Sequence, residues 1–383
     1  MIIELTKTNS AEIASALIKA RRSVGSPAMG MVQTLVVVTD TRGFDKAYEN
    51  ARQAANEHPS RVLMVVLGSG KTSVLNAQVL IGEGTAGEVV VLRLSGGLAK
   101  HPQSVVLPLL LPDSPVVVWW PGRPPVSPGT DSLGRLANRR ITDSSAAQRS
   151  VETIIDRARN HSRGDTDLAW TRLTPWRALL AAALDQYPAT IQSATVAAAR
   201  DNAPAQLMAA WLEAQLKVKV ELTTSRGPGL TLIKLGTAAG DIAIERADGL
   251  MAAYTVPGQP RRLVALKRRG LPELITEELR RLDTDDIYEK ASRVLVRRAE
   301  REAGESGDRT PSTKVPHTTK KAAAAKRVSR TKVAKKAVPT KKAAPKKAAA
   351  KKAATKKTTA GKSTAKAPAR KATRKTASGR AAR

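Results

Sequence analysis

The stretch VQTLVVVT, residues 32–39, is a β-branched apolar run with the length of one strand. Its nearly continuous apolar character is typical of a strand that is buried on both faces, as in a parallel sheet. Alanines at helical spacing follow at residues 45–57, and a second apolar run, RVLMVVL, occupies residues 61–67. This order predicts a strand–helix–strand unit with parallel strands and a right-handed crossover.

The same alternation continues on both sides of this unit. Further strands are expected at residues 88–94 and 115–120, with a shorter one at 140–142, and short helices at 11–22 and 101–111. Asp143 or Ser144 is expected to cap a helix that runs through residue 158. We therefore predict an α/β N-terminal domain with a mostly parallel sheet over residues 1–160.

A polar break at residues 161–167 precedes a region with a different pattern. Helical spacing near residues 174–184 and 207–216 is followed by strand-like runs at 217–224, 230–235, 241–246, 251–256 and 263–266. Glycine turns between these runs favour an antiparallel meander. A charged helix is expected at residues 273–301. Residues 161–303 are thus predicted to form a smaller α+β domain.

The C-terminal segment, residues 304–383, is rich in Lys, Ala, Thr and Pro. The whole chain carries a formal net charge of +32, but residues 311–383 hold 25 of its 65 Lys and Arg and none of its 33 Asp and Glu, which leaves +7 for residues 1–310. A segment with so little bulky apolar surface does not offset the entropy of ordering, so we predict a disordered basic tail.

Dense lysines predict sequence-independent, salt-sensitive binding of this tail to DNA or RNA. The alternative is a solvated tail with weak affinity for polyanions. The lysines assigned to polyanion binding are Lys335, Lys336, Lys341, Lys342, Lys346, Lys347, Lys351 and Lys352.

The composition also limits the chemistry of the chain. It contains no cysteine and only four widely spaced histidines, so thiolate sites are impossible and a histidine metal site is not expected. No nucleophile–base set stands out, and no apolar run has the length of a signal peptide or a membrane span. We expect a cytoplasmic, non-catalytic protein without a metal or cofactor.

The sequence GSGKT from Gly68 to Thr72 follows a predicted strand and is similar to the end of a phosphate-binding loop. The complete pattern requires a glycine five positions before Gly70, where Val65 stands, and only a weak helical pattern follows. We interpret this segment as an ordinary turn, and a nucleotide-binding enzyme is the alternative.

Trp119 and Trp120 are adjacent at the end of a predicted strand and precede PGRPP. Neighbouring strand residues point to opposite faces, so at most one of them enters a given core face. Trp and Arg concentrate binding energy at protein interfaces. We predict that Trp119, Trp120 and Arg123 contact a partner protein; the alternative is that both tryptophans are structural.

A second unusual stretch, DLAWTRLTPWR at residues 167–177, combines two tryptophans with two arginines. We assign Trp170 and Trp176 to a domain core. Arg172 and Arg177 are predicted to meet carboxylates across an interface with a partner.

Four stretches together resemble a known family: QTLVVVTD (33–40), PDSPVVVWWPGRPP (112–125), RRITDSS (139–145) and DLAWTRLTPWR (167–177). About residues 1–300 resemble the OpcA family, the glucose-6-phosphate dehydrogenase assembly proteins of actinobacteria and cyanobacteria. The resemblance implies an α/β domain followed by an α+β domain. It also implies a non-catalytic activator that binds glucose-6-phosphate dehydrogenase and promotes its active oligomer in the oxidative pentose phosphate pathway.

The basic tail departs from the core of that family. It leaves a nucleic-acid-associated protein as an alternative function.

Overall fold

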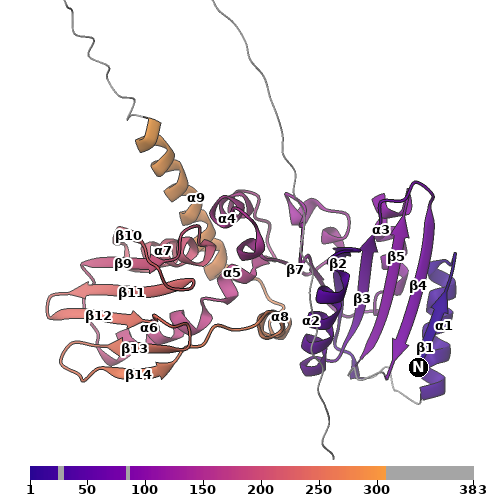
Figure 1. Ribbon diagram of the computed structural model, residues 1–383, viewed down its shortest axis with the longest axis horizontal. Helices are drawn as coiled ribbons and strands as arrows, with labels where there is room; N and C mark the ends of the chain where they lie inside the picture. Colours follow the sequence, from indigo (N-terminus) through magenta and orange to yellow (C-terminus); the bar gives the residue numbers. More distant parts are fainter. Residues whose placement is uncertain (25–29, 83–86, 308–383) are drawn as a thin grey trace, which may run out of the picture. The chain divides into compact units, whose positions relative to one another are not determined.

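The computed structural model of the chain describes residues 1–24, 30–82 and 87–307. The described residues belong to one compact unit, in which they form two β-sheets with helices packed against them (Figure 1). The α/β and α+β parts are both present, as predicted. The predicted polyanion-binding lysines lie outside the described residues.

The first sheet has eight strands in the order β1-β4-β5-β3-β2-β6-β7-β8. The six strands β2, β3 and β5 to β8 are mutually parallel. At one edge, β4 runs antiparallel to β5, and β1 runs antiparallel to β4. The bounds are β1 Ile2–Leu5, β2 Gln33–Asp40, β3 Ser60–Leu67, β4 Val74–Ile81, β5 Glu88–Ser95, β6 Val116–Trp119, β7 Arg139–Thr142 and β8 Asp165–Asp167.

Both faces of the central strands β2, β3 and β6 are buried, because helices cover each face of the sheet. Helix α1 (Ser10–Val24) and the short α3 (Pro102–Val106) pack on one face. Helices α2 (Phe44–Glu57) and α8 (Leu271–Arg280) pack on the other. Trp120 belongs to the core on the face covered by α1, and Trp119 to the core on the face covered by α2. The two indoles therefore point to opposite faces, as strand geometry predicts.

The second sheet has six strands in the order β10-β9-β11-β12-β13-β14. β9 and β10 are parallel, and the remaining neighbours are antiparallel. The strands are β9 Ser193–Ala198, β10 Val220–Thr224, β11 Leu230–Thr237, β12 Gly240–Glu245, β13 Met251–Thr255 and β14 Arg262–Ala265. The helices that share their core are α4 Ser150–Arg159, α5 Leu168–Thr171, α6 Thr174–Gln186, α7 Ala203–Leu216 and α9 Asp286–Gly307.

The single charged helix predicted at residues 273–301 is wrong, because this segment forms two helices, α8 and α9. The Asp285 carboxylate caps the start of the second helix, because it accepts hydrogen bonds from the N–H groups of Ile287 and Tyr288 at 3.0 and 2.9 Å. The apolar face of α8 packs on the first sheet, on the face that α2 also covers, whereas α9 packs in the core of the second sheet. We call the cores around the first and second sheets the first and second cores. The charged pattern of the sequence continues from α8 into α9, although the two helices must be separate to pack in different cores.

Two smaller expectations also differ from the structure. The segment after Thr72 forms strand β4 rather than a weak helix, because its alternating side chains pair with β5. Asp143 caps the short 3-10 helix η6 (Ser144–Ala146) and not α4, whose preceding residue is Arg149.

The proposed division at residues 160/161 stays a prediction, and β8 of the first sheet lies beyond it. No described helix is both long enough and apolar enough to cross a bilayer.

A buried ion pair holds α8 against the first sheet. Arg139 of β7 donates to Glu278 through Nε at 2.9 Å and Nη2 at 2.5 Å. Only 4% of Arg139 and 5% of Glu278 are exposed. Glu278 also accepts a hydrogen bond from the Thr171 hydroxyl at 2.6 Å. One carboxylate thus joins α8, β7 and α5.

We expect Glu278→Ala to lower the free energy of unfolding by about 3–5 kcal/mol, because it leaves the Arg139 guanidinium buried without a carboxylate. The double variant Arg139→Met/Glu278→Leu should recover most of this loss, since neither charge then remains. Denaturant unfolding measures both, with Glu152→Ala in the exposed pair Arg149–Glu152 as the control that changes little. A double variant no more stable than Glu278→Ala would contradict the argument.

Candidate functional site

A crevice lies at the carboxyl ends of the central parallel strands. β3 pairs with one side of β2 and β6 with the other, so the order of the sheet diverges at this point. Open α/β sheets form ligand crevices where such a divergence occurs. The cavity measures about 720 Å³ and is bordered by the end of β2, the start of α2, residues 121–123 and η6. We call it the carboxyl-end crevice.

The turn from β2 into α2 shapes one wall of this crevice. The Asp40 carboxylate accepts a hydrogen bond from the Gly43 N–H at 2.8 Å. A Cβ atom at Gly43 would lie 2.6 Å from Thr39 Oγ1, so a larger residue would require this turn to shift. The charged residues of the whole crevice are the cations Arg42, Lys46, Arg123 and Arg172 and the carboxylates Asp40 and Asp143. This excess of cations favours acidic groups on a partner.

The ion pair of Asp143 and Arg172 is a bidentate contact in the crevice wall. Arg172 donates two parallel hydrogen bonds to the carboxylate, at 2.8 Å from Nη1 and 2.9 Å from Nη2. The same carboxylate accepts from the Ser145 N–H at 3.1 Å. Burial raises the pKa of Asp143, whereas the Arg172 guanidinium opposes that rise.

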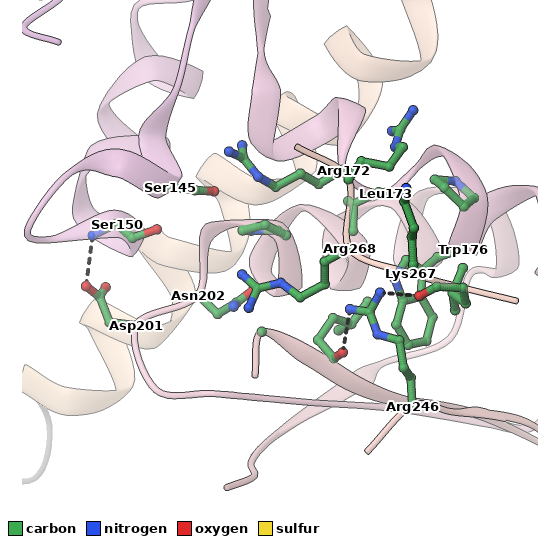
Figure 2. Close-up of a pocket in the computed structure, with 16 residues that line it drawn as sticks. Ser145, Ser150, Arg172, Leu173, Trp176, Asp201, Asn202, Arg246, Lys267 and Arg268 are labelled. Carbon is green, nitrogen blue, oxygen red and sulfur yellow. Dashed lines mark hydrogen bonds between the residues drawn. The ribbon is translucent and has the colours of Figure 1, made fainter. Parts of the chain in front are cut away.

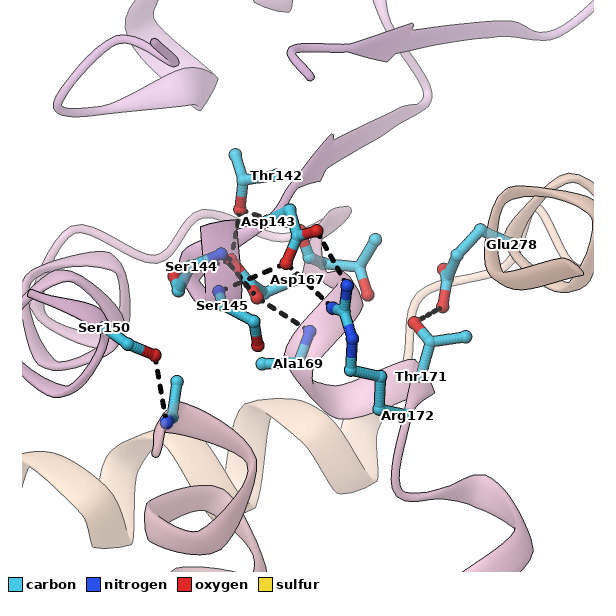
Figure 3. Close-up of polar contacts among 12 residues, drawn as sticks. Thr142, Asp143, Ser144, Ser145, Ser150, Asp167, Ala169, Thr171, Arg172 and Glu278 are labelled. Carbon is cyan, nitrogen blue, oxygen red and sulfur yellow. Dashed lines mark hydrogen bonds and ion pairs between the residues drawn. The ribbon is translucent and has the colours of Figure 1, made fainter. Parts of the chain in front are cut away.

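A neighbouring carboxylate, Asp167, fixes the backbone from which this pair extends (Figure 3). Asp167 is fully buried and accepts hydrogen bonds from the Thr142 hydroxyl, the Ser144 N–H and hydroxyl, and the Ala169 N–H, at 2.7 to 3.0 Å. These neutral donors join the end of β7, η6 and the start of α5. They hold Arg172 opposite Asp143.

The two tryptophans predicted to contact a partner lie inside the protein. Trp119 is 0% exposed and Trp120 is 3% exposed. A partner that docks beside them would touch the residues that cover the indoles rather than the rings. Arg123 is exposed and lies in the crevice wall, where a partner can reach it.

The arginines predicted to meet external carboxylates are arranged differently. The carboxylate that binds Arg172 is Asp143 of this chain. The Arg177 guanidinium lies 3.7 Å from the centre of the Trp170 ring, and burial lowers the pKa of Arg177. Trp170 and Trp176 belong to the second core, as predicted. A partner-binding role for Arg172 and Arg177 stays a prediction.

The Gly68–Thr72 segment leads into strand β4 and not into a helix, so it lacks the following helix N-terminus of a phosphate-binding loop. Its backbone is engaged instead with the neighbouring loop, since Gly68 N–H donates to Leu94 O and Gly96 N–H to Gly70 O, both at 2.8 Å. This arrangement does not favour the nucleotide-binding alternative. Among residues 1–24, 30–82 and 87–307, no group of His, Asp and Glu is placed to hold a metal ion.

Sequence reasoning missed a second cavity in the C-terminal half of the described chain. Its cations include Arg246, which follows an apolar strand, and the basic run at residues 267–269. These signals are visible in the sequence, but only the fold brings them together.

Comparisons with known proteins give concordant results along the chain. Residues 51–159 match the glucose-6-phosphate dehydrogenase subunit N-terminal domain, and residues 163–292 match the C-terminal domain of the same subunit. A Synechocystis protein named provisionally as the OxPP cycle protein OpcA is 32% identical over 101 residues. That alignment covers 26% of this chain and only 21% of the relative.

A solved structure of a mutant of KijD10, a 3-ketoreductase from Actinomadura kijaniata, in complex with TDP-benzene and NADP, aligns at a TM-score of 0.40 with 10% identity. The alignment covers 70% of this chain and 96% of that one. A likeness this distant carries no argument about activity.

Arg172→Met is expected to make the fold more sensitive to rising pH. A carboxyl pKa that is raised in the folded state contributes stability below its unfolded value, about 3.8 for Asp143, and this contribution is lost as the pH rises. Arg172 opposes the rise of the Asp143 pKa, so its removal should extend the pH range over which this stability is lost to higher pH. The free energy of unfolding relative to wild type should therefore fall as the pH rises above about 3.8.

Urea unfolding at several pH values measures this difference. The double variant Asp143→Asn/Arg172→Met lacks the titrating carboxyl and should not show the added pH dependence. The same slope in both variants would assign the effect to another group.

Proposed function

We propose, because this chain belongs to the OpcA family of glucose-6-phosphate dehydrogenase subunits, that it binds that dehydrogenase and promotes its active oligomer without catalysing a reaction itself. The observation that carries the proposal is the match of both family domains in their natural order, over residues 51–159 and 163–292. The cytoplasm, where no disulfide is needed, is the proposed site of action.

An activator must bind one state of its target more tightly than another. We assign the first contact to the carboxyl-end crevice, because its wall carries an excess of cations and an exposed arginine, Arg123. The buried Trp119 and Trp120 would support this surface from beneath, one on each face of the sheet. Acidic groups of the dehydrogenase oligomer are the chemical complement of such a surface.

Arg123→Ala is expected to weaken association with the dehydrogenase by about 2 kcal/mol, or about thirtyfold in Kd, if Arg123 is an interface anchor. Titration of purified dehydrogenase with this protein, followed by NADPH formation and by sedimentation, measures activation and oligomer size together. Arg262→Ala is the matched control, since Arg262 is another exposed arginine and lies on β14, away from the crevice.

Equal activation by Arg123→Ala and wild type would remove the crevice from the mechanism. Failure of the wild type to associate with the dehydrogenase, or turnover of a metabolite by this protein alone, would overturn the proposed function itself.

The basic tail supports a second proposal, that the chain also associates with DNA or RNA. The observation is compositional: 25 Lys and Arg with no Asp or Glu in residues 311–383. Lysines that neutralise phosphates release counterions, so affinity falls steeply with salt. The absence of aromatic residues in this segment disfavours base stacking, so little sequence preference is expected.

Removal of the residues after Ser312, the end of the compact unit, should abolish retention of duplex DNA in a mobility-shift experiment. The full chain should show a logarithmic salt dependence with a slope of several units. Equal retention by the truncated and full-length proteins would place DNA binding in the folded part.

A further inference from the structure

We propose that the second cavity is a binding site for a small phosphate-bearing anion. This basic cavity has a volume of about 290 Å³ and lies among the starts of α4, α6 and α7, the start of β11 and residues 266–269 (Figure 2). The proposal concerns this chain alone and does not depend on binding of the dehydrogenase.

Arg246 is the buried charge of the basic cavity. Only 5% of the residue is exposed, and its guanidinium lies 4.8 Å from the centre of the Trp176 ring. It donates to the carbonyl oxygens of Leu266 and Leu230 at 2.8 and 3.1 Å. Its Nε is buried and has no hydrogen-bond partner. Neutral carbonyls therefore hold the side chain, but they do not neutralise its charge.

The charges nearest to Arg246 leave it without a counter-ion. The exposed Arg268 repels it, and burial together with that repulsion lowers the pKa of Arg246. Asp248 acts in the opposite direction more weakly, and its Oδ1 accepts hydrogen bonds from the N–H groups of Leu250 and Met251. Neither arginine forms an ion pair within the described residues. The guanidinium of Arg268 lies beside Gly229, where a Cβ atom would be 3.8 Å from Arg268 Cζ.

The remaining charged groups of the cavity wall have partners within the chain. Asp201 is the one carboxylate among the residues that line it, and it accepts from the N–H groups of Ser150 and Val151 at 2.9 and 2.8 Å, which hold it in place without neutralising its charge. The other cations bind carboxylates of this chain, in the pairs Arg172–Asp143, Lys267–Glu273 and Arg269–Glu277. An added anion would therefore meet Arg246 and Arg268 as its free partners.

The size and lining of the cavity indicate the class of ligand. Small-molecule pockets commonly measure roughly 300–1,000 Å³, so this one suits a small molecule better than a dinucleotide. Two guanidinium groups and the positive end of the α6 dipole favour a phosphate group. Trp176, Pro175 and Leu266 supply an apolar wall for a short carbon skeleton. Inorganic phosphate and a phosphate monoester share the chemistry that this site recognises.

Isothermal titration calorimetry of the full-length protein with inorganic phosphate, and separately with glycerol 3-phosphate, tests the proposal. Arg268→Met should raise Kd by about tenfold or more, because it removes a charge-assisted contact. The control Arg262→Met removes an equally exposed charge on β14 and should leave Kd unchanged. Comparison of these variants cancels any binding to the tail, which all of them retain.

Arg246→Gln provides a second test, with folding verified by circular dichroism, and should also weaken binding. Binding of both probes, or of glycerol 3-phosphate alone, supports the proposal and decides whether the carbon skeleton contributes. Equal affinities for Arg268→Met and Arg262→Met would overturn it. The absence of binding of either probe would also overturn it, and a loss of dehydrogenase association in Arg268→Met would then assign the cavity to an acidic group of the partner protein.

Discussion

Two adjacent arginines of the short strand β7 are buried, and each requires a carboxylate inside the fold. Successive strand residues point to opposite faces, so the two guanidinium groups bind partners on opposite faces of the sheet. Arg139 binds Glu278, which lies 139 residues later in the chain. Arg140 binds Asp165 at the start of β8 and the carbonyl oxygens of the surrounding loops. An unpaired buried guanidinium is costly, so both partners must be in place before β7 is stable.

This requirement explains why a helix that follows the strands of the second sheet in sequence packs on the first sheet. Helix α8 lies between elements of the second core in sequence, yet its apolar side chains belong to the first. Glu278 ties it to β7 and, through Thr171, to α5. Leu271, the first residue of α8, also borders the carboxyl-end crevice. The proposed partner surface is therefore shaped by residues from both family domains, and damage to the buried pair would disturb that surface as well as stability.

The central parallel strands follow from sequence because their apolar runs are long and continuous, as at residues 33–40 and 61–67. Strands β1, β4, β8 and β9 were missed, since short or alternating segments give a weak signal. The opposite orientations of Trp119 and Trp120 follow from strand geometry alone. Their complete burial does not, because it depends on helices contributed by distant parts of the chain.

The ion pairs are harder to predict than the strands. Nothing local assigns Arg139 to Glu278 or Arg172 to Asp143, because the partners are brought together only by the packed sheet and helices. Sequence reasoning therefore identified Arg172 as a residue in need of a carboxylate but placed that carboxylate on another molecule. The same limit applies to Arg246 and Arg268, whose proximity depends on the second sheet.

Buried charge alone does not distinguish a structural residue from a ligand-binding one, because ion-pair networks also perturb pKa values. The useful distinction is whether the compensating charge lies within the chain. Burial lowers the pKa of Arg61, but Glu88 binds its guanidinium at 3.0 Å, so its charge is accounted for by the fold. Arg246 is equally buried, yet its closest charged influence is another arginine. The other buried arginines of the described residues, Arg61, Arg139, Arg140 and Arg298, each bind a carboxylate of this chain. Arg246 lacks such a carboxylate and lies beside a cavity, which is the electrostatic arrangement that an external anion would complete.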